Sequence, residues 1–235
     1  QGTTAGQRRI AASVGTLAEE ARKQQFQAPS IIVVGEVCRL ADQFAWYEKL
    51  PLSGERILVT RPRERGLKLQ EQLKKLGAEV LSVPVIRTVP LEDTARLLAV
   101  EKELKRLSEY EVLVFTSPYG VERFFEILLE EGLDVRNVSH MRFAVIGQGT
   151  CDALRKRGIR ADYMPDRYDG ASLGRLLTEV LKDGDRILLA RSSIGGAEII
   201  RELEKNPALS YTDLAVYDTK FLEEQKPRLR SFMED

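Results

Sequence analysis

The chain has 235 residues, of which 43% are hydrophobic and 31% are charged. This composition is typical of a folded globular protein and excludes a disordered or fibrous chain, and the length allows one large domain or two small ones. The 36 basic and 36 acidic residues balance each other, which argues against a generalised nucleic-acid-binding protein.

The first fifty residues predict a helix, a strand and a connector. Apolar residues recur at helical spacing in the stretch 8–25, and APSIIVVGEV (28–37) predicts a short buried strand. The segment 42–54 is aromatic at first and ends in Pro and Gly, as a connector does. Because these elements cannot bury a core alone, we expect residues 1–50 to be the end of another domain. The start at Gln1 leads us to expect a fragment or a processed product.

From Gly54 onward, predicted strands alternate with predicted helices. This alternation is typical of βαβ units and a mainly parallel sheet, so the fold class is α/β. The predicted strands lie at 56–60, 78–88, 111–117 and 142–147, and the predicted helices at 64–77, within 92–107, from 118 to about 130, at 150–158 and at 171–182.

The chain also repeats itself. GERILVTRP (54–62) returns as GDRILLARS (184–192), and VPVIRT (83–88) returns as LAVYDT (214–219). A complete second copy would need about 70 residues more than the chain has. The repeat therefore predicts a pseudo-twofold protein whose second copy is incomplete.

Several predicted helices begin with residues that expose backbone N–H groups. In FTSPYGV (115–121), Ser117 is placed as the N-cap and Pro118 as the first helical residue. One interpretation is an ordinary helix cap. The other is a carboxylate- or phosphate-binding helix start at the carboxyl edge of a parallel sheet.

Three further turns have the same character. VIGQGT (145–150) opens with Gly147 and has Thr150 as its expected cap, but Asp152 stands where a dinucleotide fingerprint needs Gly. The other two turns are YDGASLG (168–174), capped by Ser172 or Asp169, and ARSSIGG (190–196), which carries Arg191. Several donor-rich turns at one sheet edge predict a site for a ligand with several negative charges.

Other candidate residues have plain alternatives. Tyr217 lies on a predicted strand, where a tyrosine usually packs in the core. Arg61 directly follows a strand and could face a cleft. His140 is the only histidine, which weakens a metal site or a Ser-His-Asp triad. The two cysteines are far apart and the longest apolar run is short, so we expect a cytoplasmic protein that does not span a membrane.

The order of these motifs resembles uroporphyrinogen-III synthase over residues 54–219. The segment before it is similar to the C-terminal tail of uroporphyrinogen-III C-methyltransferase, and the junction resembles bifunctional fusions of the two enzymes. The motifs that carry the resemblance are GERILVTRP, VPVIRT, FTSPYGVERFF, FAVIGQGTCDALRKRGI, PDRYDGASLGRLL, RILLARSSIGG and LAVYDT.

The resemblance implies two α/β lobes joined by a two-strand linker. It divides the chain into a methyltransferase tail (1–50), the first part of lobe one (54–85), lobe two (86–217) and a return into a truncated lobe one (218–235). The open edge of lobe one is then a place for self-association. A truncated lobe one also leads us to expect inefficient turnover.

The resemblance further implies a lyase that needs neither cofactor nor metal. The family cyclises the linear tetrapyrrole hydroxymethylbilane, losing water and inverting the last pyrrole ring. Tyr217 matches the tyrosine proposed to assist departure of the hydroxyl. The positions matched to binding of the acetate and propionate groups are Thr116, Ser117, Gly147, Thr150 and Ser172, and we add Arg191 and Arg61 as candidates.

One alternative function stays open. A two-lobed α/β module could bind an anionic small molecule without chemistry, and consumption of the ligand would separate it from an enzyme. Tyr119 also departs from the family pattern, which often has a small or polar residue there.

Overall fold

Parallel strands alternate with helices along most of the chain in a computed structural model, which describes residues 4–234 and only the backbone at 63–65. The α/β class with parallel sheets, predicted from the sequence, is confirmed. The chain divides into two compact units, one of residues 88–220 and one of residues 1–87 with 221–235.

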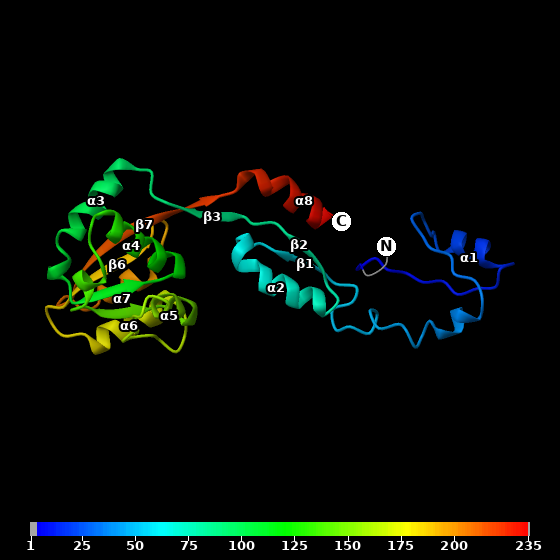
Figure 1. Cartoon of the computed structure of the whole chain (residues 1–235), viewed down its shortest axis with the longest axis horizontal. Helices are drawn as coiled ribbons and strands as arrows, with labels where there is room; N and C mark the ends of the chain where they lie inside the picture. The colour runs from blue at the N-terminus through cyan, green and yellow to red at the C-terminus, as the bar shows by residue number, and fades with distance from the viewer. Residues whose placement is uncertain (1–3, 235) are drawn as a thin grey trace. The chain divides into compact units, whose positions relative to one another are not determined.

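The unit of residues 88–220 is built on a five-stranded sheet in the order β3-β7-β6-β4-β5 (Figure 1). The strand β4 pairs in parallel with β5 and β6, and β6 pairs in parallel with β7. The strands are β3 (Ile86–Val89), β4 (Val112–Phe115), β5 (Arg142–Val145), β6 (Arg186–Ser192) and β7 (Ser210–Phe221).

Helices cover both faces of this sheet, because its central strands are apolar on both sides. Leu113 and Phe115 of β4 join the core beneath α3, α4 and α5, whereas Val112 and Val114 join the core beneath α6 and α7. The helices are α3 (Thr94–Leu104), α4 (Pro118–Glu130), α5 (Gln148–Arg155), α6 (Gly170–Val180) and α7 (Glu198–Leu203), with short 3₁₀ turns η2 (Leu107–Glu109) and η3 (Val135–Val138).

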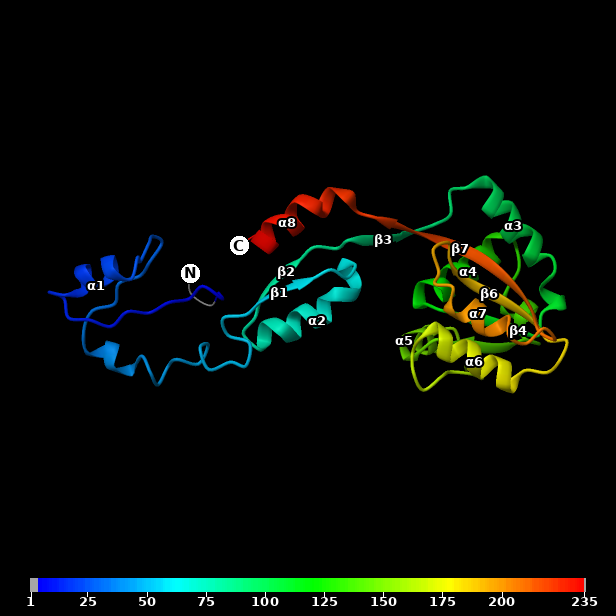
Figure 2. The same cartoon turned by 180° about the vertical axis from the view of Figure 1, so that it is seen from behind.

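The other unit contains a two-stranded parallel sheet of β1 (Arg56–Val59) and β2 (Glu79–Ser82), joined by α2 (Arg63–Lys75). Gly77 follows α2 with φ +98°, the left-handed conformation that favours glycine after a helix. The chain returns to this unit through η4 (Glu223–Gln225) and α8 (Lys226–Glu234), and α8 runs beside the small sheet in both views (Figures 1 and 2).

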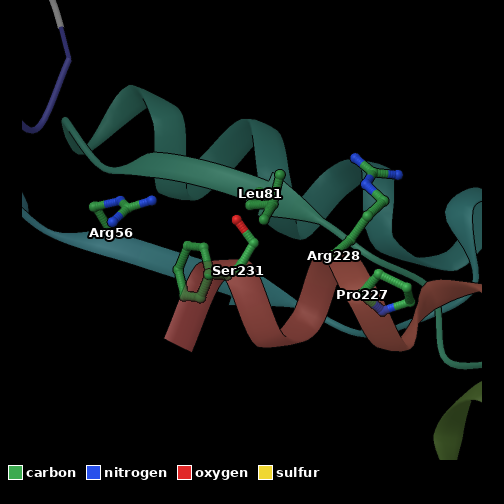
Figure 3. A pocket seen from close by; sticks show the side chains of 6 residues that line it. Arg56, Leu81, Pro227, Arg228 and Ser231 are labelled. Carbon is green, nitrogen blue, oxygen red and sulfur yellow. The ribbon is translucent and has the colours of Figure 1, made fainter. Parts of the chain in front are cut away.

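A cavity of about 390 Å³ lies between α8 and the small sheet (Figure 3). The Arg56 guanidinium lies 4.9 Å from the centre of the Phe232 ring at its edge. The lining residues are Arg56, Leu81, Pro227, Arg228, Ser231 and Phe232. None of them is among the predicted site residues.

The prediction for the N-terminal segment was wrong in two respects. The helix α1 (Leu17–Lys23) is much shorter than the predicted stretch, and the segment continues through the 3₁₀ turn η1 (Glu36–Leu40). Residues 31–34 form no strand, and Ile31 is 91% exposed. An apolar run becomes a strand only where a neighbouring strand takes its backbone hydrogen bonds, and these residues lie against no such neighbour within the described chain. No helix within residues 4–234 combines the length and apolar composition needed to cross a membrane.

Candidate functional site

The predicted site residues of the larger unit follow strands that end side by side. In the sheet register, Phe115 of β4 pairs with Val145 of β5 and with Ala190 of β6. Because these strands are parallel, the residues after them emerge at the same edge of the sheet. This is the edge at which open α/β sheets bind ligands.

The helix α4 starts at this edge as the sequence predicts. Ser117 is its N-cap: the Ser117 Oγ accepts a hydrogen bond from the Gly120 N–H at 2.9 Å, and Pro118 is the first helical residue. Thr116 lies directly before the cap, half-buried in the bend that follows β4. The local sequence therefore sets both the helix start and the position of the Ser117 hydroxyl.

Tyr217 reaches the same place because of an irregularity in β7. Arg191 pairs with Ala215, but Ser192 pairs with Tyr217, so Val216 is an extra residue in the strand. In regular alternation, Tyr217 would face away from Val216. With the bulge, both side chains join the core beneath α4. The predicted alternative of a core tyrosine with a satisfied hydroxyl describes its burial well, since Tyr217 is only 5% exposed.

The Tyr217 hydroxyl lies 2.8 Å from the Ser117 Oγ, and either oxygen is able to donate. The Tyr119 ring packs perpendicular to the Tyr217 ring, with their centres 4.9 Å apart. Burial raises the pKa of Tyr119, and the negative charge of Glu126 raises it further. The structure therefore brings the half-buried Ser117 and Tyr119 together with the buried Tyr217 at the edge where the parallel strands end.

The start of α5 lies next to these residues. A methyl group on Gly149 would lie 3.6 Å from the Pro118 ring. The N-cap of α5 is Gly147, whose carbonyl accepts the Thr150 N–H at 3.1 Å, so the expected cap at Thr150 is corrected. Thr150 instead lies in the first turn of the helix, 2% exposed. The Tyr168 ring lies so close to Gly147 that a Cβ there would be 2.8 Å from it.

The start of α6 settles the choice between two caps. Asp169 is the N-cap and accepts the Ser172 N–H at 2.7 Å. This bond to the Ser172 backbone, more than any other interaction, lowers the pKa of Asp169. The Ser172 hydroxyl accepts from Arg175 at 3.0 Å, so Ser172 is half-buried within the first turn and does not cap the helix.

Arg191 is placed differently from what a substrate ligand needs. Its side chain is 5% exposed, and its guanidinium donates two hydrogen bonds to the Asp213 carboxylate at 2.6 and 2.7 Å. A third bond, at 2.5 Å, goes to the Gly196 carbonyl. These hydrogen bonds hold the turn that follows β6 in place. They do not support the predicted role of Arg191 in binding a substrate carboxylate.

Arg61 belongs to the other unit, where it follows β1 and is exposed. Within the part of the chain that the structure describes, no three His, Cys, Asp or Glu side chains gather in a way that could hold a metal ion.

Sequence reasoning missed the roles of Tyr119, Tyr168 and Asp213. The two tyrosines stand inside motifs already singled out, so an aromatic residue beside a donor-rich turn was the available signal. Asp213 lies on a different strand from Arg191, and nothing in the sequence pairs them.

Comparison with known proteins shows the family to which the chain is similar. The model of the family described as uroporphyrinogen-III synthase HemD matches residues 68–235. The chain is 32% identical over 229 residues to the porphyrin biosynthesis protein HemD of Ruminiclostridium josui, covering 97% of this chain and 45% of that protein. It is 24% identical to the uroporphyrinogen-III C-methyltransferase of Bacillus subtilis, covering 94% of this chain and 40% of that protein. The chain thus spans less than half the length of these relatives.

The fold also has a solved counterpart. A crystal structure of a mutant uroporphyrinogen-III synthase from Thermus thermophilus matches with a TM-score of 0.58 at 18% identity, covering 77% of this chain and 68% of that one. At this identity, the match establishes the likeness of fold alone.

Proposed function

The chain belongs to the uroporphyrinogen-III synthase family, and we propose that it carries the cyclising lyase activity of that family, which converts hydroxymethylbilane to uroporphyrinogen III in tetrapyrrole biosynthesis. The observation that carries the proposal is the position of the Tyr217 hydroxyl, 2.8 Å from the Ser117 Oγ beside the start of α4. A phenol held by a neighbouring hydroxyl group suits the donation of a hydrogen bond to a leaving group.

In the proposed reaction, the bond between the hydroxymethyl carbon and its oxygen breaks, and Tyr217 assists by donating toward the departing oxygen. The hydroxyl group leaves as water. The methylene carbon then forms a bond with the substituted α-carbon of the last pyrrole ring. The existing bond from that carbon to its methylene bridge breaks, and the bridge forms a new bond with the free α-carbon of the same ring, which loses its proton, so that the ring is inverted. Much of the rate enhancement would come from folding the linear substrate so that the methylene carbon meets the substituted α-carbon.

The negatively charged side chains of the substrate need donors that do not move. The starts of α4 and α5 offer backbone N–H groups beside Thr116, Gly147 and Thr150, and the positive end of each helix dipole favours a carboxylate there. We propose that the backbone N–H groups at these two helix starts bind the substrate carboxylates. Ser172, at the start of α6, is a further candidate.

We also propose that residues 1–50 are the end of a methyltransferase domain that acts in the same cytoplasmic pathway. Support comes from the match to a protein named as a C-methyltransferase and from the exposed apolar run 31–34, which the described chain does not cover. Binding of S-adenosylmethionine by a form extended at the N-terminus, and not by this chain, would test it.

The activity is tested by generating hydroxymethylbilane in situ, adding the protein, and separating the oxidised uroporphyrin isomers by chromatography. The chain is compared with a form extended at the C-terminus by about 70 residues, the length that the sequence repeat predicts for the rest of the second copy. We expect type III product from the extended form. A reaction without protein is the control, and it gives the spontaneous type I isomer.

Type I product alone from both forms would contradict the synthase proposal. It would favour the other candidate, a module that binds an anionic small molecule without consuming it. Tyr217→Phe in the active form should lower the yield of type III while the fold is kept, because only the hydroxyl is removed.

A further inference from the structure

We propose that Ser117 is a positioning residue that orients the Tyr217 hydroxyl toward the substrate, with Tyr119 and Gly120 as its supports. This inference rests on the proposed function, in which Tyr217 donates to the leaving hydroxyl. It assigns Ser117 a different task from the carboxylate binding that the sequence predicts.

The hydrogen bonds of Ser117 give the first argument. The Ser117 Oγ already accepts the Gly120 N–H at 2.9 Å, and its own proton is left to donate. The Tyr217 oxygen lies at 2.8 Å, so it is the acceptor within reach. When Ser117 donates to Tyr217, the Tyr217 proton stays available for the substrate.

The direction of the bonds gives the second argument. The Gly120 N–H donates to the Ser117 hydroxyl, and when Ser117 in turn donates to the Tyr217 hydroxyl, each group donates to the next. Hydrogen bonds that run in one direction polarise one another. The chain of bonds therefore makes the Tyr217 hydroxyl a better donor at the point where the substrate oxygen departs.

The ring contacts of Tyr217 give the third argument. The Tyr119 ring stands at 90° to the Tyr217 ring, a favourable aromatic arrangement that fixes the ring plane. Gly120 leaves room for the Ser117 hydroxyl, because a Cβ there would lie 3.1 Å from the Ser117 Oγ and 3.3 Å from the Ala190 carbonyl oxygen. Residues 117–120 thus hold the tyrosine by its hydroxyl and by its ring from one turn of α4.

The test replaces Ser117 with Gly and with Thr. Glycine removes the hydroxyl but costs an N-cap only a few tenths of a kcal/mol, so α4 should still form. We expect Ser117→Gly to lower kcat about tenfold, with KM within about twofold of the parent. Ser117→Thr keeps a hydroxyl and should restore most of the rate. If Ser117 instead binds a substrate carboxylate, its replacement by glycine should raise KM, and that result would overturn the inference.

A double-mutant cycle separates action through Tyr217 from direct action. In a Tyr217→Phe background, Ser117→Gly should cause no further loss, because the hydroxyl that it positions is gone. An equal loss in both backgrounds would overturn the inference.

The ring contact is tested in parallel. Tyr119→Ala should lower kcat and Tyr119→Phe should not, since the contact needs only the ring. Tyr211→Phe on β7 is the matched control: its hydroxyl bonds to Glu204 on the other face of the sheet, and its kcat should equal the parent value.

Different results would overturn the role of Ser117 and the synthase activity. Type III product from the parent, with full activity in Ser117→Gly, would overturn this inference and leave the synthase activity intact. No type III product from either unsubstituted form, the chain or its extended version, would overturn the proposed function, and this inference with it.

Discussion

Removing the carboxylate of Asp213 should weaken the larger unit more than the loss of an ordinary surface ion pair. Its partner, Arg191, has a side chain that is 5% exposed and donates two hydrogen bonds to the Asp213 carboxylate. In Asp213→Ala, that buried guanidinium keeps only its bond to the Gly196 carbonyl. A positive charge without its counter-ion is then held away from water, which is the costly part of breaking a buried pair.

The magnitude follows from the burial of the two partners. Breaking a fully buried pair costs about 3–5 kcal/mol. The Asp213 side chain is 39% exposed, so water screens part of the interaction and can partly replace the lost carboxylate. We therefore expect Asp213→Ala to lower the free energy of unfolding by about 2–3 kcal/mol.

Urea unfolding of the parent and the variant measures this difference. Asp152→Ala is the matched control, because its partner Arg155 is 69% exposed and the pair should contribute less than about 0.5 kcal/mol. Arg191→Met combined with Asp213→Ala should recover at least half of the loss, since no buried charge is left. A single variant Asp213→Ala that unfolds within about 0.5 kcal/mol of the parent would refute the reasoning.

Two further predictions concern the same unit. Gly174→Ala should lower the free energy of unfolding by about 1–3 kcal/mol, because its Cβ would lie 2.6 Å from the Glu202 Cβ and 2.9 Å from the Ile199 carbonyl oxygen; a raised melting temperature, the usual result of Gly→Ala in an open helix, would contradict it. For Asp185, burial alone would raise the pKa, but the bonds from Arg142 and from the Lys182 N–H outweigh it and lower the pKa below the ordinary value of 3.8. Its stabilisation is then complete above that value and is lost as the pH falls through the lower folded-state pKa. Urea midpoints of the parent and Asp185→Asn should accordingly differ at neutral pH and converge in acid, and a gap that stays constant would contradict the assignment.

Local signals in the sequence predicted the start of α4 well. Ser117 and Pro118 are adjacent, and the cap depends on residues within one turn, so the pattern carries the whole geometry. The α/β alternation was predictable for a similar reason, because apolar runs and helical spacing are local properties. The predicted α5 cap at Thr150 was wrong, because Gly147 takes that position, and the α6 cap was left open between Ser172 and Asp169.

Features that depend on distant partners were not predictable. Tyr217 faces α4 because of a bulge at Val216, and the sequence of one strand does not reveal an extra residue relative to its neighbour. Arg191 looked like a ligand because its partner Asp213 comes from the next strand of the sheet. The apolar run 31–34 has the composition of a strand, but composition cannot say whether a neighbouring strand is present.

The continuity of residues 88–220 has a consequence for the order of folding. This unit is one uninterrupted stretch, whereas the other unit combines residues 1–87 with residues 221–235. The larger unit can therefore fold during synthesis as soon as β7 has been synthesised. The chain passes between the two units at β3 and again at the end of β7, and these strands are neighbours in the sheet of this unit. When the unit folds, it therefore brings these two segments together and meets most of the entropy cost of closing the loop between them. The hydrogen bond from the Leu222 N–H to the Val85 carbonyl then joins two segments that are already close together. We therefore expect the discontinuous unit to fold second.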